Sequence, residues 1–180
     1  MTLSQLCLVL AATMVVSHGF AFLKPETVSG WLQRFPRNVS IGVPLMLIGT
    51  AWFEWNLWHE TLSDIAPWKN LMLLGFGLVG IGSCFFVKDY LSVRGFSVVL
   101  LMVAWVVCEK ARWHPSDWRR ALIAWAYVWV LAGLWWSMAP WRLRDWIQWI
   151  VARPALFRGA AAAGVVWGLF VGALGMSVLR

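Results

Sequence analysis

Charged residues are scarce in this chain of 180 residues. Asp, Glu, Lys and Arg together make up 13% of it, against about 25% in a typical soluble domain. Apolar residues account for 61%, where soluble domains have roughly 45–50%. A water-soluble globule needs more charge on its surface than this chain contains. The composition therefore excludes a soluble protein and predicts a polytopic membrane protein.

Cysteines and acidic residues are also few. The three cysteines, Cys7, Cys84 and Cys108, lie in apolar stretches without a CxxC or CxxCH spacing, so we expect neither a disulfide framework nor covalently attached haem. Eight acidic residues against fifteen basic ones give a net charge of +7. In a soluble protein this would suggest nucleic acid. Here the bases cluster between apolar stretches, as they do on the cytoplasmic side of membrane proteins, and we expect no nucleic-acid partner.

Long apolar stretches dominate what is present. Crossing the bilayer core of about 30 Å takes roughly 20 apolar residues. We expect an all-α integral membrane protein, a single transmembrane domain over residues 1–180, with about six helices arranged as three helical hairpins. We interpret the first helix as retained rather than cleaved as a signal peptide, because no basic residue precedes it. The predicted spans are residues 3–23, 39–58, 70–87, 95–111, 119–139 and 159–178.

The orientation follows from the distribution of Lys and Arg. The loops after the first, third and fifth spans carry more bases than the opposite side, and such loops are cytoplasmic. This predicts a multi-pass protein of a bacterial-type inner (plasma) membrane with both termini on the non-cytoplasmic side. The loop 109–120 opposes this prediction, since it carries four bases that are only partly offset by Glu109 and Asp117.

A short pattern occurs twice, 115 residues apart. Its apolar positions are spaced as on one face of a helix, which predicts two short amphipathic helices lying in the cytoplasmic membrane interface. We expect Trp31, Arg34, Arg142 and Trp146 to anchor these helices, and interpret the pattern as a possible repeat of 3–58 in 119–178. The first copy is Pro25, Val28, Trp31, Leu32, Gln33 and Phe35, and the second is Pro140, Leu143, Trp146, Ile147, Gln148 and Ile150.

The last span carries a row of glycines. Gly164, Gly168 and Gly172 repeat every four residues, and Gly175 follows. In lipid, small residues let helix backbones approach closely, which favours association. The row predicts a packed neighbour, which is either another helix of this chain or another subunit.

Ionisable residues within spans are costly and suggest function. Glu54 lies about one turn from the outer end of the second span, and His18 about one turn from the inner end of the first. For Glu54 we consider a structural partner such as Asn56, or a ligand or proton role. For His18 we consider a hydrogen bond to a backbone carbonyl, or a role in binding a cofactor.

His59 and His114 are expected on the outer face, each directly after a tryptophan. With nearby carboxylates they could bind a metal or haem. No HExxH motif or i, i+4 histidine pair supports this, so solvated loop residues are the alternative. No cofactor is required by the sequence, although haem or a pigment is possible. Helix caps are also expected here, from Ser63 or Asp64 and from Ser116 or Asp117.

Sixteen tryptophans are present. Most fall near the ends of the predicted spans, as in the aromatic belts at the two membrane interfaces. Four lie deeper, where they either pack within the bundle or stack on a lipid or pigment. These four are Trp105, Trp125, Trp129 and Trp167.

Functional motifs are absent. No Ser-His-Asp arrangement or relay of acids is found, so the sequence does not support an enzyme or a proton pump. Our leading hypothesis is a non-catalytic structural or assembly subunit of a larger membrane complex, in contact with lipid and with other membrane subunits. The alternatives are a haem-, pigment- or metal-binding redox protein, and a small transporter or lipid-handling enzyme.

Overall fold

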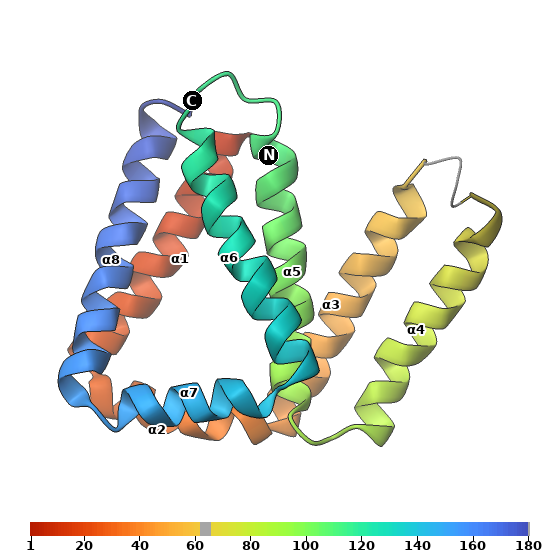
Figure 1. Cartoon of the computed structure of the whole chain (residues 1–180), viewed down its shortest axis with the longest axis horizontal. Coiled ribbons are helices and arrows are strands. Elements are labelled where there is room, and N and C mark those ends of the chain that lie inside the picture. The colour runs from red at the N-terminus through yellow and green to blue at the C-terminus, as the bar shows by residue number, and fades with distance from the viewer. Residues whose placement is uncertain (62–65, 180) are drawn as a thin grey trace. The chain divides into compact units, whose positions relative to one another are not determined.

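The computed structural model describes residues 1–61 and 66–179 (Figure 1). The described chain is helical and contains no strand, which confirms the predicted all-α class. Short 3-10 turns, Phe35–Arg37 and Ala66–Trp68, precede two of the helices. The α-helices are α1 (Leu3–Leu23), α2 (Pro25–Arg34), α3 (Val39–His59), α4 (Lys69–Phe86), α5 (Leu91–Ala111), α6 (Arg119–Met138), α7 (Trp141–Val151) and α8 (Pro154–Met176).

Five helical segments in the described part are long and apolar enough to cross a membrane, which is compatible with a multi-pass membrane protein. The sequence predicts a sixth span, which corresponds to α3. This helix has the same length as α1, but Glu54, Asn56 and several tryptophans lower the hydropathy of its C-terminal half. The five segments are Leu3–Leu23, Ala66–Phe86, Leu91–Ala111, Arg119–Met138 and Pro154–Met176.

Local signals explain where the helices begin. A capping box between Thr2 and Gln5 starts α1, and the Asn38 side chain accepts a hydrogen bond from the Ile41 amide (3.1 Å) at the start of α3. α8 begins at Pro154, five residues before the predicted span, because proline fits the first turn of a helix. The apolar stretch therefore marks the span and not the whole helix.

α5 also begins earlier than the sequence predicts, at Leu91 instead of residue 95. Tyr90 has a φ of 56°, which ends the preceding turn, and the Leu91 amide donates to the Lys88 carbonyl (3.4 Å). Arg94 consequently lies in the first turn of α5 rather than in a loop.

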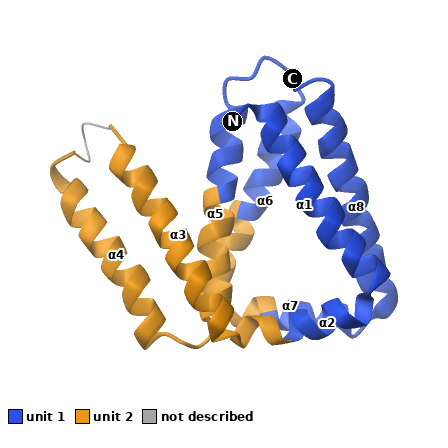
Figure 2. Cartoon of the chain, turned by 180° about the vertical axis from the view of Figure 1, so that it is seen from behind, with its two compact units in different colours: residues 1–33, 103–129, 144–180 blue, residues 34–102, 130–143 orange. Residues whose placement is uncertain are grey.

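The chain divides into two compact units (Figure 2). Unit 1 comprises residues 1–33, 103–129 and 144–180, and unit 2 comprises residues 34–102 and 130–143. In unit 1, α1 and α8 pack side by side along their length (Figure 1). Where these two helices meet α2 and α7, Ala21, Phe157 and Ala161 form a buried cluster. The apolar residues Val28, Leu32, Ile150 and Val151 pack against it.

In unit 2, α3 packs against both α4 and α5. Gly42 lies against the backbone of Leu91 and Ser92, where a Cβ atom would come within 2.6 Å of the Ser92 nitrogen. The Ser92 hydroxyl donates to the Phe35 carbonyl (2.5 Å), which joins the first turn of α5 to the turn before α3. On the other side of α3, Thr50 lies over Gly80 of α4.

Candidate functional site

The glycine row of α8 faces α1 within unit 1. A Cβ atom on Gly164 would overlap the His18 ring, and one on Gly175 would lie 2.7 Å from the Cys7 Cβ. The Ser4 hydroxyl also donates to the Gly175 carbonyl (2.6 Å). α1 thus occupies this face. Between these two positions, Gly168 lies against Met14 and Val15, and Gly172 lies against Ala11.

His18 is held between these two helices. Its Nδ1 lies 3.0 Å from the Met14 carbonyl oxygen, which can only accept, so Nδ1 carries the proton. The ring lies against Gly164, where an added Cβ would be 2.7 Å from Nε2. This arrangement suits a side chain that fills the contact between α1 and α8.

The other two histidines make local contacts. His59 Nδ1 donates to the Trp55 carbonyl (2.7 Å), and its ring lies against the Trp55 indole with centroids 4.4 Å apart. His114 Nδ1 accepts from the Ser116 amide (3.2 Å). Among residues 1–61 and 66–179, no three His, Cys, Asp or Glu side chains are grouped so that they could hold a metal. The expected cap at Ser63 or Asp64 lies outside the described residues.

Glu54 points toward α4. Its Oε1 is buried and has no hydrogen-bond partner in the described part of the chain, and a Cβ atom on Gly77 would be 3.6 Å from it. Asn56 bonds to the Trp52 carbonyl instead (2.7 Å). At the same end of this hairpin, the Lys69 ammonium group donates to the carbonyls of Trp58 and Glu60. The carboxyl group is therefore polar, partly enclosed and unpaired within unit 2.

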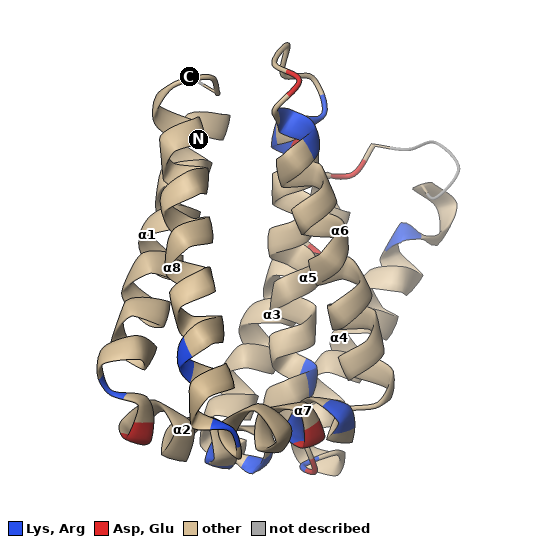
Figure 3. Ribbon diagram, turned by 60° about the vertical axis from the view of Figure 1, so that its left-hand side comes forward, with Lys and Arg blue, Asp and Glu red and all other residues tan. Residues whose placement is uncertain are grey.

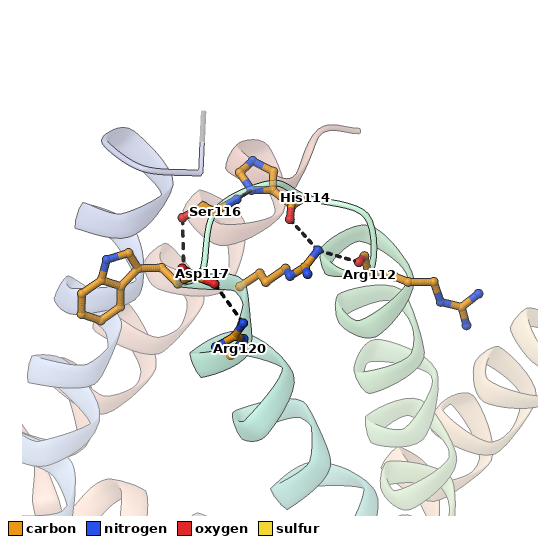
Figure 4. A network of polar contacts seen from close by, with 7 residues as sticks. Arg112, His114, Ser116, Asp117 and Arg120 are labelled. Atoms are coloured by element: carbon orange, nitrogen blue, oxygen red, sulfur yellow. Dashed lines mark hydrogen bonds and ion pairs between the residues drawn. The ribbon is translucent and has the colours of Figure 1, made fainter.

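The α5–α6 loop forms a connected polar network (Figure 4). Arg119 donates from one nitrogen to the carbonyls of Arg112 (2.9 Å) and His114 (2.6 Å). The Ser116 hydroxyl accepts from the Trp118 amide (3.3 Å), which precedes α6, so this bond is not the helix cap expected from the sequence. Ion pairs join Arg112 to Glu109 (3.7 Å) and Arg120 to Asp117 (3.0 Å).

Three of the four deeper tryptophans meet in unit 1. The ring centroid of Trp125 lies 4.1 Å from that of Trp129 and 5.7 Å from that of Trp167. Phe170 continues the cluster toward Trp118, at 5.3 Å from Trp167 and 6.0 Å from Trp118. These contacts are those of aromatic packing between α6 and α8.

The two amphipathic helices present equivalent faces. Trp31 of α2 is 52% exposed and Trp146 of α7 is 53% exposed. Leu143 and Ile147 of α7 are buried, and the matching positions of α2, Val28 and Leu32, are partly buried. Arg34 and Arg142, the other two predicted anchors, are exposed.

Arg94 is a candidate site residue that the sequence pattern indicates only as a loop base. Figure 3 shows Lys and Arg gathered at helix ends and connections, and Arg94 belongs to the first turn of α5. Its Nε is buried without a hydrogen-bond partner. The signal available in the sequence was its place beside Gly95, which meets the α3 backbone at Leu45 and Met46.

No family model, curated protein or solved structure matches this chain. Its function has to be argued from the residues described above.

Proposed function

We propose that this protein is a non-catalytic, multi-pass subunit that helps to assemble or stabilise a larger membrane complex through helix contacts within the bilayer. The observation that supports this proposal is the composition of the face of α4 that points away from α3. The inner face of α4 meets α3 through Gly77 and Gly80.

The outer face combines a small residue with large apolar ones. A Cβ atom on Gly75 would meet nothing within 4 Å, while Leu78 and Val79 are 64% and 67% exposed. Lipid tails are as apolar as leucine, so a purely lipid-facing helix gains nothing from a glycine there. An exposed glycine flanked by large side chains instead favours close approach of another helix. We infer that a partner helix packs over Gly75.

The same proposal includes α3 as a sixth span and both termini on the non-cytoplasmic side. The basic α5–α6 loop is the main objection to this orientation. Two of its bases, Arg112 and Arg120, form ion pairs with Glu109 and Asp117. Because acidic neighbours contribute little to the positive-inside bias, these pairs leave the objection in place, and the proposed orientation depends on the larger number of bases on the opposite side.

Extraction in mild detergent tests the assembly. The wild-type protein is expected in a complex larger than its monomer, with a partner in fixed stoichiometry. Gly75→Phe should release the monomer, because the added ring blocks close helix approach. Val166→Phe enlarges a lipid-exposed residue of α8 and is the matched control, which should leave the complex intact. A wild-type protein that is a monodisperse monomer without partner would contradict the proposal.

Glu54 supports a second candidate, a small transporter or lipid-handling protein that binds a proton or cation in the α3–α4 hairpin. The supporting observation is the buried, unpaired Oε1. A lipid-soluble carbodiimide, which adds to protonated carboxyl groups in apolar surroundings, should label Glu54 and fail on Glu54→Gln. Glu60→Gln, at the exposed end of α3, should label like the wild type. Equal labelling of both variants would exclude this candidate.

A further inference from the structure

Arg94 has no ion-pair partner among residues 1–61 and 66–179. It lies in the first turn of α5, its Nε is buried, and no hydrogen bond joins its guanidinium group to another described residue. A guanidinium group stays charged at all physiological pH values and presents five N–H donors in a rigid plane. Leaving such a donor buried and unpaired costs stability, so a missing acceptor is indicated.

A second guanidinium group contacts the turn that precedes Arg94. The Arg37 guanidinium carbon is 5.7 Å from the centroid of the Tyr90 ring. The Arg94 amide donates to the Tyr90 carbonyl (3.1 Å). Tyr90 itself has a φ of 56°, an uncommon conformation for a bulky residue. Tyr90 is thus linked to both arginines, to Arg37 through its ring and to Arg94 through its backbone.

The two arginines come from segments that are fixed to each other. Arg37 ends the Phe35–Arg37 turn, and the Phe35 carbonyl accepts the hydrogen bond from Ser92 in the first turn of α5. Ser92 is almost completely buried. The spacing of the two cations is therefore set by the fold and not by mobile loops.

The local charge is positive. Lys88 adds a third cation to the same turn, and Asp89 is its single acid. In the described part of the chain, no ion pair joins Asp89 to Arg37, Lys88 or Arg94. The cations are therefore not neutralised by this acid.

Aromatic side chains pack in the same unit. Phe96, two residues after Arg94, contacts Phe35 edge-on with centroids 5.9 Å apart. On its other side it stacks on Trp136, at 6.1 Å. A ligand with both an anionic group and a hydrocarbon chain would match the two kinds of surface.

We propose that Arg94 and Arg37 bind the phosphate group of an anionic phospholipid. Arginine binds phosphate through paired N–H donors, and basic sites at the ends of membrane helices recognise lipid headgroups. The first turn of a span such as α5 lies at headgroup depth. The phosphate would accept hydrogen bonds from the terminal N–H groups of the two arginines, and the acyl chains would pass along Phe96. This site is independent of the partner helix proposed for α4.

Native mass spectrometry of the purified full-length protein tests the site, with phosphatidylglycerol and phosphatidylcholine as probes in detergent. Phosphatidylglycerol should bind the wild type more tightly, and Arg94→Gln or Arg37→Gln should weaken it about fivefold, the effect of one basic residue near an anionic surface. Arg37→Gln changes an exposed side chain, so it keeps the test usable if Arg94→Gln fails to fold. Arg120→Gln, at the α5–α6 loop, is the control and should bind like the wild type.

Two further comparisons make the outcome decisive. Arg94→Lys keeps the charge without the planar donors and should restore only part of the affinity. Inorganic phosphate at millimolar concentration should not displace the lipid. Displacement by inorganic phosphate would overturn the lipid assignment in favour of a soluble anion. Equal binding of phosphatidylglycerol to the wild type and both Gln variants would overturn the site altogether.

Discussion

His18 of α1 lies directly over Gly164 of α8, so close that a methyl group on residue 164 would overlap the imidazole ring. Its Nδ1–H group donates a hydrogen bond to the Met14 carbonyl of the same helix. The polar edge of the ring is thus satisfied within α1, and the remainder of the ring fills the space that a glycine leaves. The contact makes residue 164 the most size-sensitive position of the α1–α8 pair.

Gly164→Ala should therefore destabilise the protein by about 1–3 kcal/mol, the usual cost of overpacking. Gly159→Ala on the same helix is the matched control, because a Cβ atom there meets nothing within 4 Å. Reversible unfolding in mixed detergent micelles measures both variants. Equal stability of the two would show that α1 and α8 do not pack as described.

Ser92→Ala should cost about 1 kcal/mol, because it removes a buried hydrogen bond that joins the first turn of α5 to the Phe35 carbonyl in the turn before α3. Ser97→Ala provides the comparison. The Ser97 hydroxyl is equally buried but bonds within its own helix, to the Val93 carbonyl (2.9 Å), whose backbone bond remains. The same unfolding measurement should give a smaller loss for Ser97→Ala. A larger loss would contradict the role of Ser92.

Arg119→Gln should loosen the α5–α6 loop, because Arg119 holds two backbone carbonyls of that loop. Charge-assisted hydrogen bonds contribute about 1.5–3 kcal/mol each when enclosed, and less at this partly exposed site. Amide hydrogen exchange over residues 112–118 should become several-fold faster. Arg120→Gln loses only an exposed ion pair and should exchange like the wild type. Faster exchange in both variants would mean that charge alone orders the loop.

The proposed orientation predicts which residues face outward. Trp113 is 81% exposed on the α5–α6 loop, and Gln33 is exposed at the end of α2. In a background without the native cysteines, Trp113→Cys should react with a membrane-impermeant maleimide on intact cells. Gln33→Cys should react only after the cells are opened. The reverse pattern would place both termini in the cytoplasm.

Much of the helical pattern could be predicted from the sequence, because long apolar stretches with few charges have few alternatives in a membrane. α1 has the same bounds as the predicted first span. The starts of α5 and α8 could not be located in this way. Their first turns contain Arg94 and Arg158, which a hydropathy pattern assigns to loops, although helix ends near a membrane surface tolerate such bases.

The candidate sites were harder to foresee. The glycine row of α8 was visible as a pattern, but its neighbour could be known only once α1 was placed against it. The sequence indicated His18 as a candidate ligand. Its contact with Gly164 could not be predicted, because it depends on the same packing of α1 against α8. Arg94 could not be recognised as a binding residue, because the burial of its Nε depends on how α5 packs.

Photo-crosslinking along α4 in native membranes tests the central proposal, that this helix docks onto another protein. A photoreactive residue at Leu78 or Val79, on the outer face, should give a discrete protein adduct. The same residue at Cys84, whose side chain is buried in a cluster with Met46 and Leu91, should give only a link within the chain. Adducts with lipid alone at Leu78 and Val79 would contradict the account and leave α4 as a lipid-facing helix.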